Sequence, residues 1–196
     1  MPEAAPQLRV MVVDSDSERS RNLRGALTLA GYHVVAELRE SLALPDAVKG
    51  LKPHIVIVAA DSPDRDTLEH IGVTTRDAPR PVVMFTQDGA SESIRAAVQA
   101  GVSAYVVDGL SPERIKSILD VACARFEAHQ ELAGRLAETE RQLAERKAVE
   151  KAKGLLMKKR GLDEEAAHAE LRKLAMQTGK RLGEVAETLI AAAHLL

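Results

Sequence analysis

Cysteine, aromatic residues and long apolar runs are all scarce in this chain of 196 residues. Cys123 is the single cysteine, so the chain can form neither an intramolecular disulfide nor a cysteine-based zinc site. The longest apolar run, residues 55–60, is far shorter than the roughly 20 residues that a membrane-spanning helix needs. The opening residues MPEAAPQ lack the basic and apolar regions of a signal peptide. We therefore expect a cytoplasmic protein, and no pattern predicts a cofactor or a metal ion.

The shortage of aromatic residues is complete in the last third of the chain. Residues 127–196 contain no Phe, Tyr or Trp, which excludes a platform of aromatic rings for stacking nucleic-acid bases. The six histidines are scattered, and no nucleophile and base stand at a recognisable spacing, so we expect no enzymatic activity. Hydrophobic residues make up 45% of the chain and the net charge is −2, which suits a folded protein of one or two domains.

Charge is distributed unevenly along the chain. Residues 1–120 carry 13 basic and 17 acidic side chains, a net charge of −4, and the remainder carries 14 and 12, a net charge of +2. The basic excess concentrates in residues 146–181, where 11 basic and 5 acidic side chains give +6. Such a stripe can follow the phosphates of a nucleic acid, and the solvated face of a helix has the same composition.

The first 120 residues alternate short apolar runs with helical patterns. The runs are LRVMVV (8–13), HVVAEL (33–38), HIVIVA (54–59), PVVMF (81–85) and AYVV (104–107). This alternation predicts an α/β doubly wound parallel sheet with helices on both faces. Ligands of such sheets bind beyond the carboxyl ends of the strands, so the residues at the ends of the runs and just after them are the candidate site. They are Asp14, Ser15, Ala59, Asp61, Thr86 and Asp108.

In order and spacing, these pieces resemble the receiver domains of response regulators, which have a flavodoxin-like strand order. VMVVDSD (10–16) resembles the first strand with its acidic end, and VVMFT (82–86) resembles the fourth strand with its switch hydroxyl at Thr86. The resemblance implies a pair of acids after the first strand, a phosphoacceptor aspartate four residues before Pro63, and a lysine after the fifth strand. This chain instead has Asp14 followed by Ser15, Ala59, and Asp108 at those places.

These replacements remove the groups that aspartyl phosphorylation needs: a carboxylate nucleophile, acidic ligands for Mg²⁺ and a cation for the developing charge. Asp61 could serve as acceptor if the loop were displaced by two residues, and Asp16 could replace the missing acid. Both are also typical turn and helix-cap residues. We therefore predict a degenerate receiver domain over residues 1–120, retained as a protein-binding or dimerising module.

A helical segment, residues 121–147, follows this domain and is rich in Ala, Glu, Leu and Arg. Leucines spaced by four and seven residues indicate a coiled-coil linker and a homodimer. The predicted seam consists of Leu132, Leu136 and Leu143. The seam is imperfect because Thr139 and Arg146 fall at its core positions, so a solvated single helix is the alternative.

Residues 148–196 are predicted to form a small bundle of three helices, the first of which is the end of the long helix. Asp163 can cap the second helix, and Gly179 can end it. Apolar residues between Leu182 and Ala193 give the third helix an inner face.

Three stretches of this segment resemble the ANTAR domain, an RNA-binding module named after the antiterminators AmiR and NasT. They are AKGLLM (152–157), EEAAHAELRKLAM (164–176) and EVAETLI (184–190). With the degenerate receiver, the chain resembles the NasT-like members of this family, which regulate nitrate and nitrite assimilation. The resemblance implies an antiterminator that holds RNA leader hairpins, so that a terminator cannot form. It also implies regulation by a NasS-like nitrate/nitrite sensor protein, and a homodimer that forms by itself or only on RNA.

Six basic residues of this segment are the candidate RNA contacts, and any base stacking would fall to arginine guanidinium planes. They are Lys153, Lys158, Lys159, Arg160, Arg172 and Lys173. The small and apolar residues Ala152, Gly154, Leu156, Met157, Ala166 and Ala175 are expected to pack, although Gly154 could also permit close approach of RNA. A DNA-binding regulator and a protein-binding adaptor without nucleic-acid activity are the alternatives.

Overall fold

The computed structural model describes residues 7–108 and 112–194 of the chain. The chain divides into two compact units, Met1–His129 and Gln130–Leu196. The division falls inside one long helix, α5 (Pro112–Arg160). Among the described residues, no helix is long and apolar enough to cross a membrane.

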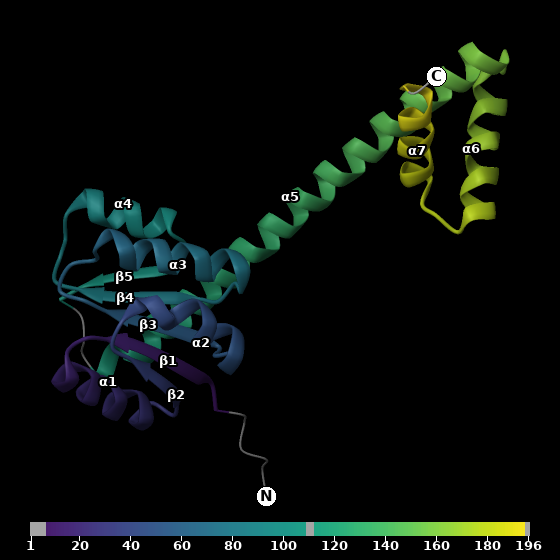
Figure 1. The fold of residues 1–196 in the computed structure, drawn as a ribbon. Coiled ribbons are helices and arrows are strands. Elements are labelled where there is room, and N and C mark those ends of the chain that lie inside the picture. The colour runs from purple at the N-terminus through teal and green to yellow at the C-terminus, as the bar shows by residue number, and fades with distance from the viewer. Residues whose placement is uncertain (1–6, 109–111, 195–196) are drawn as a thin grey trace, which may run out of the picture. The chain divides into compact units, whose positions relative to one another are not determined.

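The first unit is built on a parallel sheet of five strands in the order β2-β1-β3-β4-β5 (Figure 1). The strands are β1 (Arg9–Asp14), β2 (His33–Leu38), β3 (Ile55–Ala59), β4 (Val82–Thr86) and β5 (Ala104–Val107). All residues of β3 and β4 are buried, which explains their uninterrupted apolar sequences. The predicted doubly wound sheet and its flavodoxin-like order are confirmed.

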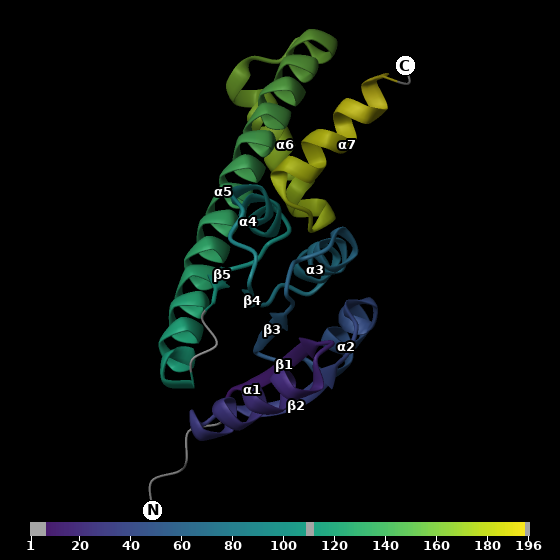
Figure 2. The ribbon, with the colours of Figure 1, turned by 90° about the vertical axis from the view of Figure 1, so that its left-hand side faces the viewer.

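Helices cover both faces of this sheet (Figure 2). They are α1 (Ser17–Leu29), α2 (Leu44–Leu51), α3 (Arg65–Asp77) and α4 (Ser91–Gln99), with a short 3₁₀ turn at Ser41–Ala43. On one face, Leu27 of α1 and Leu119 of α5 pack against alternate strand residues such as Ile57. On the other face, Val48 of α2 and Ile71 of α3 pack against the other set of alternate strand residues. Burying such side chains contributes about 1.5–3 kcal/mol each, so the two layers hold the carboxyl ends of the strands in place.

The second unit packs the last part of α5 against α6 (Glu164–Thr178) and α7 (Leu182–His194). Its buried core consists of Ala152, Leu156, Ala167, Leu171, Val185 and Ala186. The start and the end that the sequence predicts for α6 are confirmed. The Asp163 side chain accepts a hydrogen bond of 2.7 Å from the backbone N–H of Ala166, and Gly179 ends α6 with a φ of 64°. The described residues therefore form the predicted bundle of helices.

The predicted coiled-coil residues lie on the part of α5 that precedes this bundle. Leu132, Leu136 and Leu143 are 65%, 61% and 53% exposed in the single chain. Three large apolar side chains are thus available to a partner helix. Dimerisation through this seam stays a prediction.

Candidate functional sites

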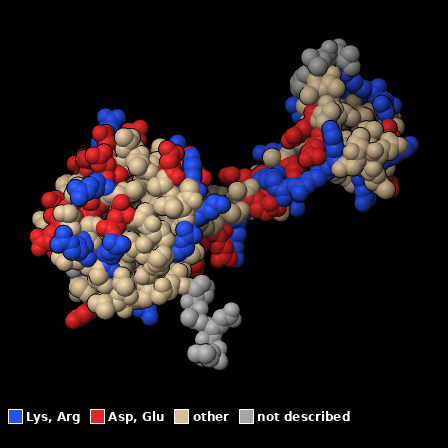
Figure 3. Space-filling view, turned by 60° about the horizontal axis from the view of Figure 1, so that its bottom comes forward, with Lys and Arg blue, Asp and Glu red and all other residues tan. Residues whose placement is uncertain are grey.

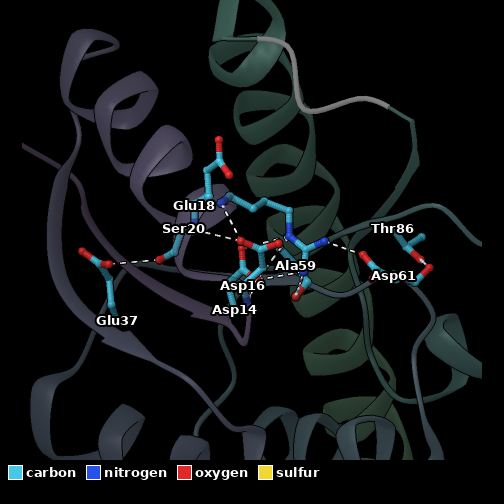
Figure 4. A network of polar contacts seen from close by, with 9 residues as sticks. Asp14, Asp16, Glu18, Ser20, Glu37, Ala59, Asp61 and Thr86 are labelled. Atoms are coloured by element: carbon cyan, nitrogen blue, oxygen red, sulfur yellow. Dashed lines mark hydrogen bonds and ion pairs between the residues drawn. The ribbon is translucent and has the colours of Figure 1, made fainter.

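The degenerate receiver site lies where the strands end. β1 and β3 pair in register so that Asp14 stands beside Ala59, and both residues are buried. Thr86 ends β4 and is also buried, and its hydroxyl donates a hydrogen bond of 2.9 Å to the backbone oxygen of Asp61. The structure thus brings these four predicted residues together (Figure 4).

The other two predicted residues of the site are exposed. Ser15 follows β1, and its side chain makes no hydrogen bond within the described parts of the chain. Asp108 follows β5 with a φ of 50°, and its backbone N–H donates to the Thr86 carbonyl oxygen at 3.1 Å. An exposed carboxylate therefore occupies the place that the receiver pattern gives to a lysine.

Arg19, which the sequence reasoning did not single out, fills the centre of this site. Its Nε donates to Asp14 Oδ2 at 3.0 Å and its Nη2 donates to Asp14 Oδ1 at 2.8 Å, which makes a bidentate pair with a fully buried carboxylate. Its Nη1 pairs with Asp61, and its Nη2 also lies 3.5 Å from the Ala59 carbonyl oxygen. The hydrogen bonds to Asp14, and then those to Asp61, raise the pKa of Arg19 further above its usual range. A side chain of the protein therefore supplies the cation of the site.

Asp16 serves as a helix cap, as one sequence interpretation had it. Its carboxylate accepts hydrogen bonds from the backbone N–H groups of Glu18 at 2.8 Å and Arg19 at 3.0 Å, at the start of α1. These bonds lower the pKa of Asp16, with the bond from Arg19 contributing most. In the described parts of the chain, no three His, Cys, Asp or Glu side chains are grouped so that they could hold a metal ion.

Asp88 ties together the loops beside this site. Its carboxylate accepts hydrogen bonds from Ser93 Oγ at 2.6 Å, Ser62 Oγ at 3.0 Å and the backbone N–H of Ala90 at 2.8 Å. These donors, Ser93 first, lower the pKa of Asp88. The Tyr105 hydroxyl of β5 donates to the Asp88 carbonyl oxygen at 2.8 Å. The loops after β3 and β4 are therefore fixed to each other and to β5 by the protein's own groups.

The second candidate site is the basic part of the second unit (Figure 3). Two of the six predicted RNA contacts form ion pairs with carboxylates of the protein itself. Lys153 is only 8% exposed, and its Nζ pairs with Glu150 at 2.8 Å and with Glu164 at 2.7 Å, which ties α5 to the start of α6. Glu150 first, and then Glu164, raise the pKa of Lys153. Arg160 is exposed and pairs with Glu170 at 3.1 Å.

The other four predicted contacts are exposed cations, and the described residues include no ion pair for any of them. They are Lys158, Lys159, Arg172 and Lys173. Lys147 and Lys151 of α5, which the sequence reasoning did not name, are also exposed and unpaired among the described residues. Helical periodicity could have found both, because they lie one turn apart and precede Lys158 by two and three turns.

Arg172 and Lys173 help to line a shallow hollow on the surface of α6, together with Glu165, His168, Ala169, Met176 and Gln177. The Met176 side chain is 85% exposed. A cationic, planar guanidinium and a polarizable thioether therefore lie one turn apart at the same hollow. Such a surface can contact the face of an unstacked base without an aromatic ring.

The residues expected to pack in the ANTAR-like segment divide into two groups. Ala152 and Leu156 are buried, and Ala166 and Ala175 are half-buried. Gly154 and Met157 are exposed, so the expectation that they pack is wrong for this structure. The helical period explains the difference, since residues 152 and 156 lie on the inner face of α5 and residue 154 lies opposite.

The comparisons with known proteins agree with both halves of this description. The signal receiver domain of a modulated diguanylate cyclase from Desulfovibrio desulfuricans has the fold of the first unit. The match covers 63% of this chain and 98% of that one, with a TM-score of 0.56 and 16% identity. The first unit thus has the receiver fold of response regulators.

Residues 137–190 match the family model of the ANTAR domain. The chain is therefore an ANTAR-domain response regulator. The transcriptional regulatory protein PdtaR of Mycobacterium tuberculosis is 28% identical over 188 residues, which cover 96% of this chain and 92% of PdtaR. The nitrate regulatory protein of Klebsiella oxytoca is 46% identical over 68 residues, which cover 34% of this chain and 17% of that protein.

Proposed function

We propose that this chain is an RNA-binding transcription antiterminator, which binds leader hairpins and so prevents termination. The proposal rests on four exposed cations of the ANTAR domain that have no ion pair among the described residues: Lys158, Lys159, Arg172 and Lys173. Cations without internal partners are free to bind phosphates and to release the counterions of a nucleic acid. The names of the two curated relatives, which describe a transcriptional regulatory protein and a nitrate regulatory protein, support a role in transcription.

A protein partner, rather than aspartyl phosphorylation, regulates this activity in our proposal. Ala59 has no carboxylate to accept a phosphoryl group, and Arg19 occupies the space between Asp14 and Asp61. A NasS-like nitrate/nitrite sensor is the proposed partner. The segment shared with the nitrate regulatory protein of Klebsiella oxytoca supports the nitrate assignment.

The test compares two double variants of α5 with equal loss of charge. Lys158→Ala/Lys159→Ala removes exposed cations of the ANTAR domain, and Arg114→Ala/Lys116→Ala removes exposed cations of the same helix outside it. The probe is a hairpin from the leader of a nitrate or nitrite reductase transcript of the source organism, titrated at several salt concentrations. Each lost phosphate contact should reduce the log–log salt slope by about 0.7 to 0.9, so the first variant should lose about 1.4 to 1.8 and the second nothing.

Three results would count against the proposal. An unchanged slope in the first variant would remove the assigned surface, and equal losses in both variants would indicate a general charge effect. Tighter binding to a DNA hairpin of the same sequence would favour a DNA-binding regulator. Absence of any binding at moderate salt would favour the adaptor without nucleic-acid activity.

Arg172 provides a separate test of base recognition. Arg172→Lys keeps the charge but removes the planar guanidinium, which stacks and donates in a fixed geometry. We expect the salt slope to stay unchanged. The preference for the leader loop over a scrambled loop should fall by up to about 1–3 kcal/mol, the range for one base stacked on an aromatic side chain. An unchanged preference would assign Arg172 to phosphate contacts alone.

A further inference from the structure

One exposed face of α5 combines three lysines with a glycine. Lys147, Lys151, Gly154 and Lys158 follow one another at intervals of four, three and four residues, which places them on one side of an α-helix. All four residues are exposed. At about 1.5 Å per residue, the face spans about 16 Å along the helix axis.

Among the residues that the structure describes, no contact and no backbone conformation requires a glycine at position 154. A Cβ atom built there has no neighbour within 4 Å, and Gly154 is not among the glycines with a positive φ. Glycine is the least favourable residue in a helix interior apart from proline, so its presence weakens α5 without relieving any contact. A glycine does, however, let another molecule approach the helix backbone more closely than any other residue would.

The charges around Gly154 favour an anionic molecule. The described residues offer no ion pair to Lys147, Lys151 or Lys158. Glu150, one turn before Gly154, is paired with Lys153 at 2.8 Å, and this pair partly neutralises its charge. The face thus presents exposed lysines before and after Gly154, a position without a side chain.

We propose that the sugar-phosphate backbone of RNA lies along this face, with Gly154 at the point of closest approach. This inference rests on the proposed function and adds Lys147, Lys151 and Gly154 to the RNA-binding surface. The lysines on either side bind phosphates. Between them, the absent Cβ lets the ribose or phosphate contact the helix backbone, where Cα–H groups are available as weak donors.

Gly134 is a matched control on the same helix. It is exposed, no atom lies within 4 Å of a Cβ built there, and it precedes residues 137–190 of the ANTAR match. Its surroundings differ, because Glu131 and Glu138, three before and four after it, pair with Arg135 and Arg141. Gly134→Ala and Gly154→Ala should therefore raise the thermal midpoint of the protein alike, and only Gly154→Ala should affect RNA.

The experiment measures both glycine variants of the full chain with the leader hairpin used above and with polyuridylate, a single strand without sequence information. We expect Gly154→Ala to weaken binding to both RNAs about tenfold and Gly154→Leu to weaken it further, since both fill the contact. Gly134→Ala should bind as the wild type does. Lys147→Ala/Lys151→Ala should lower the log–log salt slope by about 1.4 to 1.8.

The outcomes separate this inference from the proposed function. Wild-type affinity in Gly154→Ala, together with a loss in Lys158→Ala/Lys159→Ala, would overturn the inference and leave the proposed function standing. An equal loss in Gly134→Ala would overturn it as well, because helix stiffness would then explain the effect. If Gly154→Ala weakened binding to a DNA hairpin as much as binding to RNA, the assignment to RNA would be overturned. Absence of RNA binding by the wild type would overturn both proposals.

Discussion

Arg19 of the first candidate site and the exposed lysines of the second are in opposite circumstances. In the first unit, the Arg19 guanidinium donates to Asp14 and Asp61. It thereby neutralises these carboxylates at the edge of the sheet where a receiver holds its ligands. In the second unit, Lys158 and Lys159 are exposed and have no carboxylate partner among the described residues. The first arrangement closes a site with the protein's own charge, and the second leaves charge for another molecule.

Burial accounts for this difference. The Asp14 carboxylate has no exposed surface, and a buried charge without a partner is very unfavourable, so an opposite charge has to lie against it. Surface lysines stay hydrated, and an ion pair would stabilise them by at most about 1 kcal/mol, so folding does not require partners for them. The domain, which has Ala59 at the end of β3, thus keeps the buried Asp14 carboxylate, and Arg19 provides the compensating charge.

The largest expected effect concerns the helix that runs through both units. Replacing Leu136 and Leu143 with Gln should abolish a dimer made through the predicted seam, because each buried leucine contributes about 1.5–3 kcal/mol. Sedimentation equilibrium would show the loss of mass. Ala137→Gln/Ala144→Gln is the control, since both alanines are exposed, also seven residues apart, and on a different face of α5. An unchanged mass in the leucine variant would place any dimer elsewhere.

The next effect tests whether Arg19 closes the first site. Arg19→Ala leaves the Asp14 carboxylate buried without its cation and should destabilise the first unit by about 3 kcal/mol, the lower end of the range for broken buried pairs, because Arg19 is itself partly exposed. Urea denaturation followed by circular dichroism would measure it. Arg21→Ala, an exposed neighbour on α1, should change stability by less than about 0.5 kcal/mol.

A double variant sharpens the same test. Asp14→Asn removes the buried charge, so Arg19→Ala should cost less in that background than in the wild type, and the difference is the coupling between the two side chains. Additive effects would mean that Arg19 acts mainly through its packing on the sheet. The charge of Arg19 would then contribute little to the neutralisation of the first site.

The sequence predicted what depends on local patterns and missed what depends on long-range pairing. The alternating apolar runs fixed the sheet, and Asp163 and Gly179 marked the ends of α6, because such signals act within a few residues. Arg19 stands 42 residues from Asp61. Only the strand order brings them together. The basic pattern predicts Lys153 as an RNA contact and does not reveal its pairing with Glu164, because that pairing depends on the return of the chain after α5.

Lys153 differs from the exposed lysines of the second unit because it is buried and paired with carboxylates. A variant at this position therefore tests whether only the exposed lysines bind RNA. Lys153→Met should lower the thermal midpoint of the second unit, since the pair with Glu164 joins α5 to α6, and should leave the salt slope of RNA binding unchanged. Lys158→Met is the control, and it should leave the thermal midpoint unchanged and lower the salt slope. If Lys153→Met lowers the slope as well, then Lys153 exchanges its carboxylates for phosphates on binding.

The pH dependence of this pair has a defined sign. Lys153 lowers the pKa of Glu164 below its ordinary value of 4.5, so the stabilisation is complete above that value and is lost as the pH falls through the lowered pKa. Glu150, followed by Glu164, raises the pKa of Lys153 above 10.5, so the stabilisation is lost again only as the pH rises through the raised pKa. The difference in thermal midpoint between wild type and Lys153→Met should be constant from about pH 5 to 10 and shrink outside that window.

The smallest expected effect is none at all. Wild-type protein incubated with acetyl phosphate and Mg²⁺ should show no added phosphoryl group by intact-mass spectrometry, because Ala59 cannot accept one and Arg19 covers the buried Asp14. Asp61 is exposed, but Arg19 holds its carboxylate, and no lysine follows β5 to stabilise the transferred charge.

Arg19→Ala distinguishes these causes. If that variant gains a hydroxylamine-labile phosphoryl group on Asp61, then the internal cation is the block, and if it stays unmodified, then the loss of the acceptor and the lysine is sufficient. A labile phosphoryl group on Asp61 or Asp14 of the wild type would contradict a closed site, because the phosphodonor would have to displace Arg19 to reach either carboxylate.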